Sequence, residues 1–395
     1  MGIESLGLGE RINDKDSRNL SREIGEILDL RSFQDFPGAQ PVTMCRQDIE
    51  DLKKREYYVC EKSDGVRALL LCKTVKNKGY AFAMDRKCTF IKLPSRFMPA
   101  ELMLFDGEII QHSKDTFTFM IFDMIIYNGK SIANQNLLLR LNAANRYLYD
   151  SHNWHKMTNI PEDKRFTMQL KRMHKSYGLA EVYRKIIPQL THENDGLIFT
   201  CVNHAYVPGA CRAYLKWKPA HLNSVDFRMK RSKEIVGLYD LYTSYGNNKE
   251  VLFATYWIDE IVKDIDLNVQ ARDGKPQEVY YKEPIDYNQL DGLVGEFSYK
   301  PDEYTVNTET FDLEPGRWSL LRIREDKNFP NGYKTVVGVV FSINESLEYP
   351  ELERSIPEIR AQWKAREEVK RKAVEPSAPV NGQEVDSTPA KRPAH

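Results

Sequence analysis

Apolar residues in the first 220 positions fall mainly into runs of strand length that are separated by polar breaks. These runs cover residues 57–60, 68–72, 80–86, 102–110, 117–127, 194–199 and 211–219. Apolar residues at helical spacing predict helices at 20–31, 48–54 and 137–149 and within 171–187, with Asn19 as a candidate cap of the first. This mixture predicts an α+β fold in which antiparallel sheets are combined with helices.

The pattern changes after about residue 225, where short strands alternate with turn sequences. Strands are predicted at 237–242, 251–257, 279–281 and 293–299, and turns at 247–248, 273–274 and 291–292. Short strands at this spacing predict a small closed barrel such as an OB-fold. We therefore divide the chain into a first domain (1–225), an OB-fold domain (226–345), a C-terminal helix (346–372) and a disordered tail (373–395) that is rich in Pro, Ser and charge.

Composition places the chain among soluble globular proteins and limits its partners. Apolar residues make up 41% of the 395 positions and charged residues 29%. No apolar run approaches the roughly 20 residues of a membrane span, so we expect no membrane partner. The six cysteines contain no Cys-x-x-Cys pair and are expected to be reduced thiols. The formal net charge is zero, so any nucleic-acid contact must depend on a local basic groove.

The polar segment 62–67, with the sequence Lys-Ser-Asp-Gly-Val-Arg, lies between two predicted strands. Asp-Gly between strands is a common hairpin signal, so one interpretation is a surface hairpin with ordinary charges. The other is a cleft in which Lys62 acts as a nucleophile. A lysine with the ordinary pKa of about 10.4 is protonated at neutral pH. It therefore needs nearby cations or a metal to supply free amine.

Several other charged residues lie on or beside predicted strands. Glu108 follows Asp106-Gly107 inside an apolar run, where a carboxylate needs a partner unless its strand is an edge that faces water. Asp195 stands at a strand entry, where an ordinary turn aspartate is the alternative. Lys216 and Lys218 share one face of a strand, and they face either an anion or water.

Taken in order, six segments resemble the motif set of the covalent nucleotidyltransferases, the mRNA capping enzymes and polynucleotide ligases. The segments are 62–67, 105–108, 119–123, 195–198, 215–219 and 318–327. The resemblance implies a ligase-type, ATP-grasp-like nucleotidyltransferase domain followed by an OB-fold barrel. Segments 36–42, 225–227 and 322–331 are similar to the capping branch, specifically to mRNA guanylyltransferases of the fungal single-activity type.

The resemblance implies a two-step reaction in which GTP is the substrate. Lys62 attacks the α-phosphate of GTP and becomes lysyl-GMP, and the 5′-diphosphate end of nascent RNA then accepts the GMP to give the GpppN cap. Site roles follow by resemblance. Arg67, Arg86 and Glu108 are implied to contact the ribose, and Phe122 the guanine. The α-phosphate is implied to be held by Lys216 and Lys218. The β- and γ-phosphates are implied to be reached, when the cleft closes, by Arg324, Asp326 and Lys327. Asp195 and Glu108 are implied to hold Mg²⁺ or Mn²⁺, and Asp226 lies at the hinge.

The family also implies partners and a location. These are the phosphorylated C-terminal domain of RNA polymerase II, a separate RNA 5′-triphosphatase, and the nucleus. Two alternatives remain open, an ATP-dependent polynucleotide ligase and a non-catalytic RNA-binding protein of the same fold. Covalent labelling of the chain by GTP but not by ATP would distinguish a guanylyltransferase from the ligase. The non-catalytic alternative is disfavoured because the motif lysines are all present and a binding module has no need of a nucleophile. These lysines are Lys62, Lys216, Lys218 and Lys327.

Overall fold

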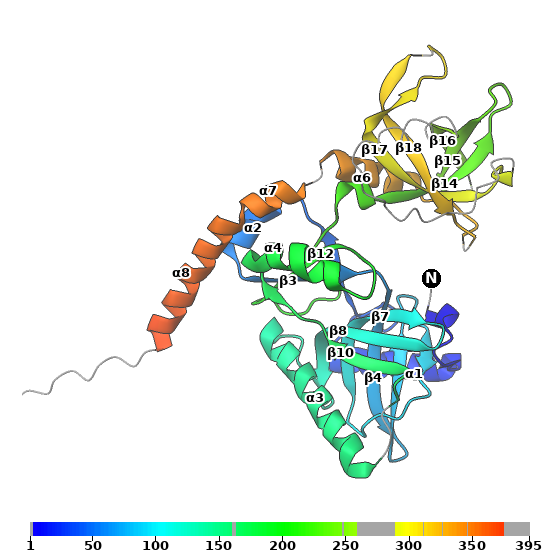
Figure 1. Cartoon of the computed structure of the whole chain (residues 1–395). Helices are drawn as coiled ribbons and strands as arrows, with labels where there is room; N and C mark the ends of the chain where they lie inside the picture. Colours follow the sequence, from blue (N-terminus) through cyan, green and yellow to red (C-terminus); the bar gives the residue numbers. More distant parts are fainter. Residues whose placement is uncertain are drawn as a thin grey trace, which may run out of the picture.

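The computed structural model describes residues 3–159, 163–246, 249–258, 289–310, 312–325, 327–345 and 347–374. These residues form two lobes, a larger one with two sheets and a smaller one built on a single sheet (Figure 1). Some predicted features lie outside the described residues, namely the strand at 279–281, the turns at 247–248 and 273–274, Asp326 and the tail from residue 375. No helix among the described residues is long and apolar enough to span a membrane.

The first sheet of the larger lobe has eight strands, in the order β1-β6-β5-β4-β7-β8-β10, with β9 also paired to β8. All neighbours are antiparallel except β8 and β10. The strands are β1 (Glu10–Arg11), β4 (Val66–Val75), β5 (Lys78–Met84), β6 (Phe90–Lys92), β7 (Met103–Ser113), β8 (Thr116–Tyr127), β9 (Lys130–Ser131) and β10 (Phe166–Leu170).

The second sheet has five strands in the order β11-β3-β12-β13-β2, with only β13 and β2 parallel. They are β2 (Ala39–Thr43), β3 (Tyr57–Ser63), β11 (His174–Lys175), β12 (Asn194–Cys201) and β13 (Gly209–Trp217). Because β3 and β4 belong to different sheets, Asp64 and Gly65 form a crossing between sheets. The hairpin interpretation of segment 62–67 is therefore wrong. Lys62 lies where the chain leaves one sheet for the other.

Strand β4 is buried on both faces, which explains why its centre is apolar at each position. Leu69 and Leu71 pack into a cluster that includes side chains of both sheets. Ala68, Leu70 and Cys72 face the opposite way, into a second cluster that also contains Tyr147 of the helix α3. Side chains on a strand alternate between faces, so a continuous apolar run indicates a strand covered on both sides.

The observed bounds of the helices agree in part with those predicted from the sequence. The larger lobe contains η1 (Ile3–Leu6), α1 (Asp14–Leu28), α2 (Asp48–Lys54) and α3 (Leu137–Thr158), and α2 has the predicted bounds. Helix α1 starts earlier than predicted, because the Asn13 side chain accepts a hydrogen bond from the Asp16 amide at 2.9 Å. Asn13, and not Asn19, is therefore the cap. Helix α3 continues for about two turns beyond the predicted end.

The helix predicted within 171–187 forms only in the later part of that range. The Lys171 amide donates to the Ile121 carbonyl at 2.7 Å beside β8, and β11 pairs with β3, so the chain is extended there. Short helical turns of differing pitch follow. They are η2 (Ser176–Gly178), α4 (Leu179–Glu181), η3 (Val182–Ile186) and η4 (Ile187–Gln189).

The smaller lobe is an antiparallel sheet in the order β16-β15-β14-β17-β18. Its elements are β14 (Ser224–Arg231), β15 (Leu238–Ser244), β16 (Glu250–Trp257), β17 (Val294–Val306), β18 (Leu313–Ile323) and α6 (Tyr333–Asn344), preceded by the turn η5 (Ala220–Leu222). Phe227, Phe297 and Trp318 form the centre of its core. Among the described residues, β16 and β18 remain at the two edges. The five strands that the structure describes here are consistent with an OB-fold, but no ladder among them closes the sheet into a barrel.

Two C-terminal helices return from the smaller lobe to the larger one (Figure 1). Helix α8 runs beside α2, and its Trp363 ring lies 6.1 Å from the ring of Tyr58 on β3. The Lys370 ammonium pairs with Glu56 at 2.7 Å. The helices are α7 (Tyr349–Arg354) and α8 (Ile356–Val374). The smaller lobe is therefore connected to the larger one at both of its ends.

Candidate active site

A pocket of about 270 Å³ lies beside the crossing from β3 to β4 and brings together most of the predicted nucleotide-binding residues. Both sheets contribute to its walls. Its lining includes six predicted site residues, Lys62, Arg67, Arg86, Glu108, Phe122 and Lys216. Asp123 of the segment 119–123 also lines it, together with Ala39, Lys171, Ile198, Tyr206 and Tyr214. Residues up to about 180 positions apart in the chain therefore meet at one site.

Lys62 at the end of β3 forms an ion pair with Asp195 on β12. The Lys62 Nζ lies 2.5 Å from Asp195 Oδ1, and the Lys218 Nζ lies 3.2 Å from Asp195 Oδ2. Gly196 makes this approach of the strands possible, because its φ is +141° and a Cβ there would lie 2.1 Å from the Trp217 carbonyl oxygen. One carboxylate thus holds two lysines next to each other.

Lys216 lies on β13, and Lys218 follows directly after the end of that strand at Trp217. Burial lowers the pKa of Lys216, and the nearby charges of Lys62, Arg86 and Lys218 lower it further, while Asp195 opposes them. The Lys216 side chain forms no hydrogen bond or ion pair with any other residue that the structure describes. Its ammonium is therefore available to an anion in the pocket.

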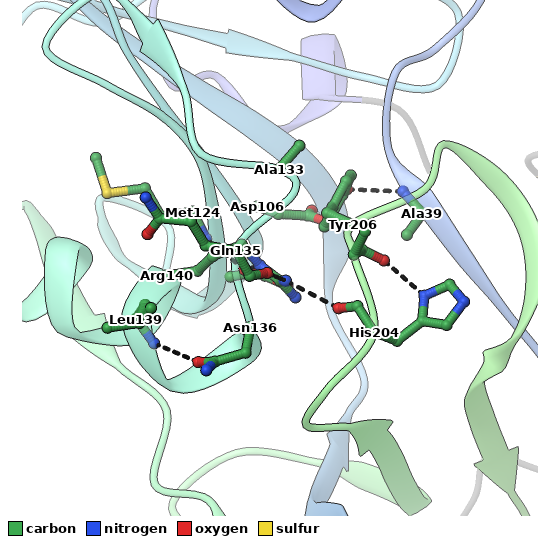
Figure 2. Close-up of polar contacts among 12 residues, drawn as sticks. Ala39, Asp106, Met124, Ala133, Gln135, Asn136, Leu139, Arg140, His204 and Tyr206 are labelled. Atoms are coloured by element: carbon green, nitrogen blue, oxygen red, sulfur yellow. Dashed lines mark hydrogen bonds and ion pairs between the residues drawn. The ribbon is translucent and has the colours of Figure 1, made fainter.

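Arg67 is held by the protein rather than being free in the pocket. Its guanidinium donates to both carboxylate oxygens of Asp106, at 2.8 and 2.6 Å, and to the Ala39 carbonyl at 3.0 Å. The Tyr206 hydroxyl donates to Asp106 at 2.5 Å and accepts from the Ala39 amide at 2.7 Å (Figure 2). The same guanidinium lies 4.5 Å from the centre of the Phe122 ring. This network fixes Arg67 and Phe122 on the pocket wall.

Strand β7 contains two acids, buried Asp106 and half-buried Glu108, and both have raised pKa values. Burial raises the pKa of Asp106 to about 6, against the lowering effects of Arg67 and Tyr206. Burial also raises the pKa of Glu108, which Lys171, Arg67 and Lys62 oppose. Strand β7 lies between β4 and β8, so the interpretation of Glu108 as an edge-strand residue facing water is wrong. Its carboxylate accepts from the Gly65 amide at 3.3 Å.

Lys171 lines the pocket and is buried, and it was not among the site residues predicted from the sequence. Its Nζ donates to the Glu61 carbonyl at 3.0 Å and lies 3.3 Å from the Glu61 carboxylate. The alternating run Phe166–Leu170 just before it was a usable signal, because it indicates a strand and not the start of a helix. A lysine after a buried strand then becomes a site candidate.

Arg324 and Lys327 do not line the pocket. Both are ion-paired to Asp226 on β14, and the Arg324 Nη1 lies 3.0 Å from Asp226 Oδ1. The Asp226 amide and carbonyl also bond to Asn331, each at 2.8 Å. In this arrangement Asp226 keeps the cationic motif on its own lobe. Asp326 lies outside the described residues.

The predicted metal ligands do not form a ready-made cluster. Within the part of the chain that the structure describes, no three His, Cys, Asp or Glu side chains are grouped as metal ligands. Asp195 bonds to two lysines, and Glu108 bonds to the Gly65 amide. A metal ion at Asp195 would have to take most of its oxygen ligands from a substrate and from water, as Mg²⁺ commonly does.

Comparison with known proteins identifies the family. A model described as "mRNA capping enzyme, catalytic domain" matches residues 5–220, and "mRNA capping enzyme, C-terminal domain" matches residues 222–353. The chain belongs to the mRNA capping enzyme family. It is 31% identical to the mRNA-capping enzyme subunit alpha of Neurospora crassa over 88% of this chain and 90% of that protein. It is 28% identical to the subunit alpha of Schizosaccharomyces pombe, over 87% of this chain and 85% of that protein.

Among solved structures, this capping enzyme family member is similar to a mycobacterial DNA ligase D complexed with ATP and MES. The TM-score is 0.36 and the identity 15%, over 73% of this chain and 94% of that one. We therefore draw the functional argument from the family and from the site.

Proposed function

We propose that this chain is an mRNA guanylyltransferase that transfers GMP from GTP to the 5′-diphosphate end of nascent RNA through a lysyl-GMP intermediate. The observation that carries the proposal is the placement of Lys62 in the pocket, within 2.5 Å of Asp195 and beside Lys216. A nucleophile, a proton acceptor and a cation without a partner are the groups that the first step needs.

The first step forms a P–N bond and breaks a P–O bond. The proton on Lys62 Nζ leaves toward Asp195 Oδ1, the nearest acceptor, and the free amine attacks the α-phosphorus. Pyrophosphate departs with the electron pair of the broken P–O bond. Lys216 and Lys218 offset the negative charge that develops on the phosphate oxygens, and a cation held in a half-buried site does so without reorganising solvent.

The same pocket residues account for nucleotide binding. Phe122 offers an aromatic surface for the guanine, while Arg67, Arg86 and Glu108 surround the place of the ribose. Because Asp106 and Tyr206 fix Arg67 beside Phe122, this wall is formed before the nucleotide arrives. We propose these roles for the pocket residues.

Incubation with α-labelled GTP or α-labelled ATP tests the function directly. We expect an acid-labile, heat-stable protein label from GTP that moves to RNA bearing a 5′-diphosphate and not to RNA bearing a 5′-hydroxyl. Label from ATP with no label from GTP would favour the polynucleotide ligase. No label from either nucleotide would favour the binding protein.

We propose Asp195, with Glu108 as a second candidate, as the protein ligand of a Mg²⁺ or Mn²⁺ ion. A single carboxylate fits an ion whose other ligands are phosphate oxygens and waters. When bound, such an ion neutralises negative charge on the phosphates. We expect EDTA to lower GMP loading by at least about a hundredfold, and added Mg²⁺ or Mn²⁺ to restore it. Full loading in metal-free buffer would contradict this role.

Substitution of Lys327 by alanine tests whether the smaller lobe takes part in loading. Lys327 and Arg324 must leave Asp226 before they can reach the β- and γ-phosphates of GTP. We expect Lys327→Ala to slow GMP loading by about tenfold or more, and to slow transfer from preformed enzyme–GMP much less. Quenched-flow measurement of each step separates them. Equal losses in both steps would contradict a role in closure.

We also propose a separate RNA 5′-triphosphatase and the phosphorylated tail of RNA polymerase II as partners, and the nucleus as the location. The curated relatives are named as an alpha subunit, which supports the existence of a further subunit. Pull-down with phosphorylated and unphosphorylated tail peptides tests the polymerase contact. Copurification with a triphosphatase activity tests the second partner, and a fluorescent fusion tests the location.

A further inference from the structure

A second cavity, of about 460 Å³, lies on the other side of Lys62, between the larger lobe and helix α6 of the smaller one. Lys62 and Lys216 line both cavities. The additional walls come from β2, β12 and β13, from the chain that links the lobes, and from α6. These additional residues are Thr43, Met44, Asp195, Trp217, Lys218, Asn223, Lys334, Thr335, Gly338, Val339 and Leu347.

The charge of this cavity is strongly positive. Its lining contains four lysines (Lys62, Lys216, Lys218 and Lys334) and a single acid, Asp195. Asp195 already pairs with Lys62 and Lys218. The side chain of Lys334, in the first turn of α6, has no hydrogen bond or ion pair with any other residue in the described ranges. An excess of cations in a cleft attracts a multiply charged anion.

The position of α6 is set by contacts within both lobes. The Trp217 Nε1 donates to the Leu347 carbonyl at 2.6 Å, which joins the two chain segments that connect the lobes. The Ser244 amide donates to the Asn331 carbonyl at 3.0 Å just before α6 begins. Lys334 is therefore carried by a positioned helix and not by a loose loop.

The arrangement of the smaller lobe favours the acceptor RNA over GTP as the anion. In this arrangement Arg324 and Lys327 are retained by Asp226, and neither lines either of these two cavities. The proposed contact of those residues with GTP requires a different position of the lobe. The lobe shown here instead presents α6 and Lys334 to Lys62. It therefore fits the step after pyrophosphate has left, when RNA enters.

We propose that the second cavity binds the 5′-diphosphate of the acceptor RNA and that Lys334 is a positioning residue for its phosphates. This inference rests on the proposed guanylyltransferase function. In the transfer step, an oxygen of the RNA terminal phosphate forms a bond to the phosphorus of lysyl-GMP. The P–N bond breaks, and Lys62 Nζ keeps the electron pair and takes up a proton. Lys334 holds the attacking phosphate and does not touch the guanosine.

The test compares loading and transfer in Lys334→Ala, Lys334→Arg and Lys233→Ala. Lys233 is an exposed lysine of the same lobe that lines neither cavity, so it controls for loss of charge. Each enzyme is loaded with α-labelled GTP, freed of nucleotide and mixed with subsaturating 5′-diphosphate RNA. We expect the ratio of transfer rate to loading rate to fall about tenfold in Lys334→Ala, equivalent to ~1.4 kcal/mol.

Further readouts separate a phosphate contact from a structural effect. We expect Lys334→Ala to raise the KM for RNA with little change in kcat, and to weaken the salt dependence of RNA binding. Lys334→Arg should recover most of the ratio, and Lys233→Ala should match the wild type. A ratio for Lys334→Ala within about twofold of wild type would overturn the proposal.

Parallel loss of loading and transfer would also overturn it, because that result places Lys334 on the phosphates of GTP. Failure of the wild-type enzyme to form lysyl-GMP would count against the proposed function itself. Normal wild-type labelling with an unchanged Lys334→Ala ratio would count only against this inference.

Discussion

We expect Lys62→Arg to abolish labelling of the chain by α-labelled GTP, with a loss of at least about a thousandfold. Arginine keeps the positive charge and much of the ion pair with Asp195, which Lys62 makes at 2.5 Å. It lacks an amine that can lose a proton at neutral pH and form a P–N bond. The measurement is gel autoradiography after incubation with GTP and metal, followed by mapping of the labelled peptide in the wild type.

Lys73→Arg is the matched control for that experiment. Lys73 lies on β4, pairs with Glu23 at 2.6 Å and lines neither cavity. We expect Lys73→Arg to be labelled as strongly as the wild type. Covalent GMP on Lys62→Arg, or a labelled peptide that lacks residue 62 in the wild type, would contradict the assignment of the nucleophile.

Sequence reasoning succeeded where a property depends on neighbours along the strand. Lys216 and Lys218 were predicted on one face of a strand, and the structure places both lysines beside Lys62, where they line the second cavity together. The alternation of a strand is local, so residues two apart share a face whatever the rest of the chain does. The long apolar run 117–127 was likewise predicted as a strand, and β8 confirms it.

Sequence reasoning failed where pairing between distant segments decides the structure. Asp64-Gly65 carries the local signal of a hairpin, but β3 and β4 each find partners in different sheets. The network around Arg67 could not be predicted from a local pattern either, because Asp106 and Tyr206, which hydrogen-bond in it, are 100 positions apart in the sequence. Burial and partner choice are properties of the assembled sheets, and a local pattern does not contain them.

The buried pair Asp123–Arg140 provides the largest expected effect on stability. Arg140 on α3 is 0% exposed and Asp123 on β8 is 2% exposed. The guanidinium donates to both Asp123 oxygens, at 2.7 and 2.8 Å. It also donates to the carbonyls of Gln135 and His204 (Figure 2), so it joins α3 to two loops. We expect Arg140→Met to lower the free energy of unfolding by about 3–5 kcal/mol, because a buried carboxylate loses its partner.

Urea unfolding of three variants at several pH values tests this expectation. Arg146→Met, on the same helix, removes an exposed arginine 3.9 Å from Asp150, and we expect a change below about 0.5 kcal/mol. Burial already raises the pKa of Asp123, and Arg140 opposes that rise. Without Arg140 the folded-state pKa rises further above its unfolded value. The protonated form then preserves stability at low pH, and stability is lost as pH rises through the folded pKa.

The defect of Arg140→Met should therefore be smaller at low pH than at neutral pH. The double variant Asp123→Asn/Arg140→Met should recover part of the loss, because it removes the charge that was left unpaired. A pH-independent defect with no recovery in the double variant would show that packing of the Arg140 side chain, and not its charge, stabilises α3 against β8. In the sequence, Asp123 belongs to the motif segment 119–123, whereas Arg140 is an ordinary polar position in a predicted helix. Their energetic importance follows from complete burial.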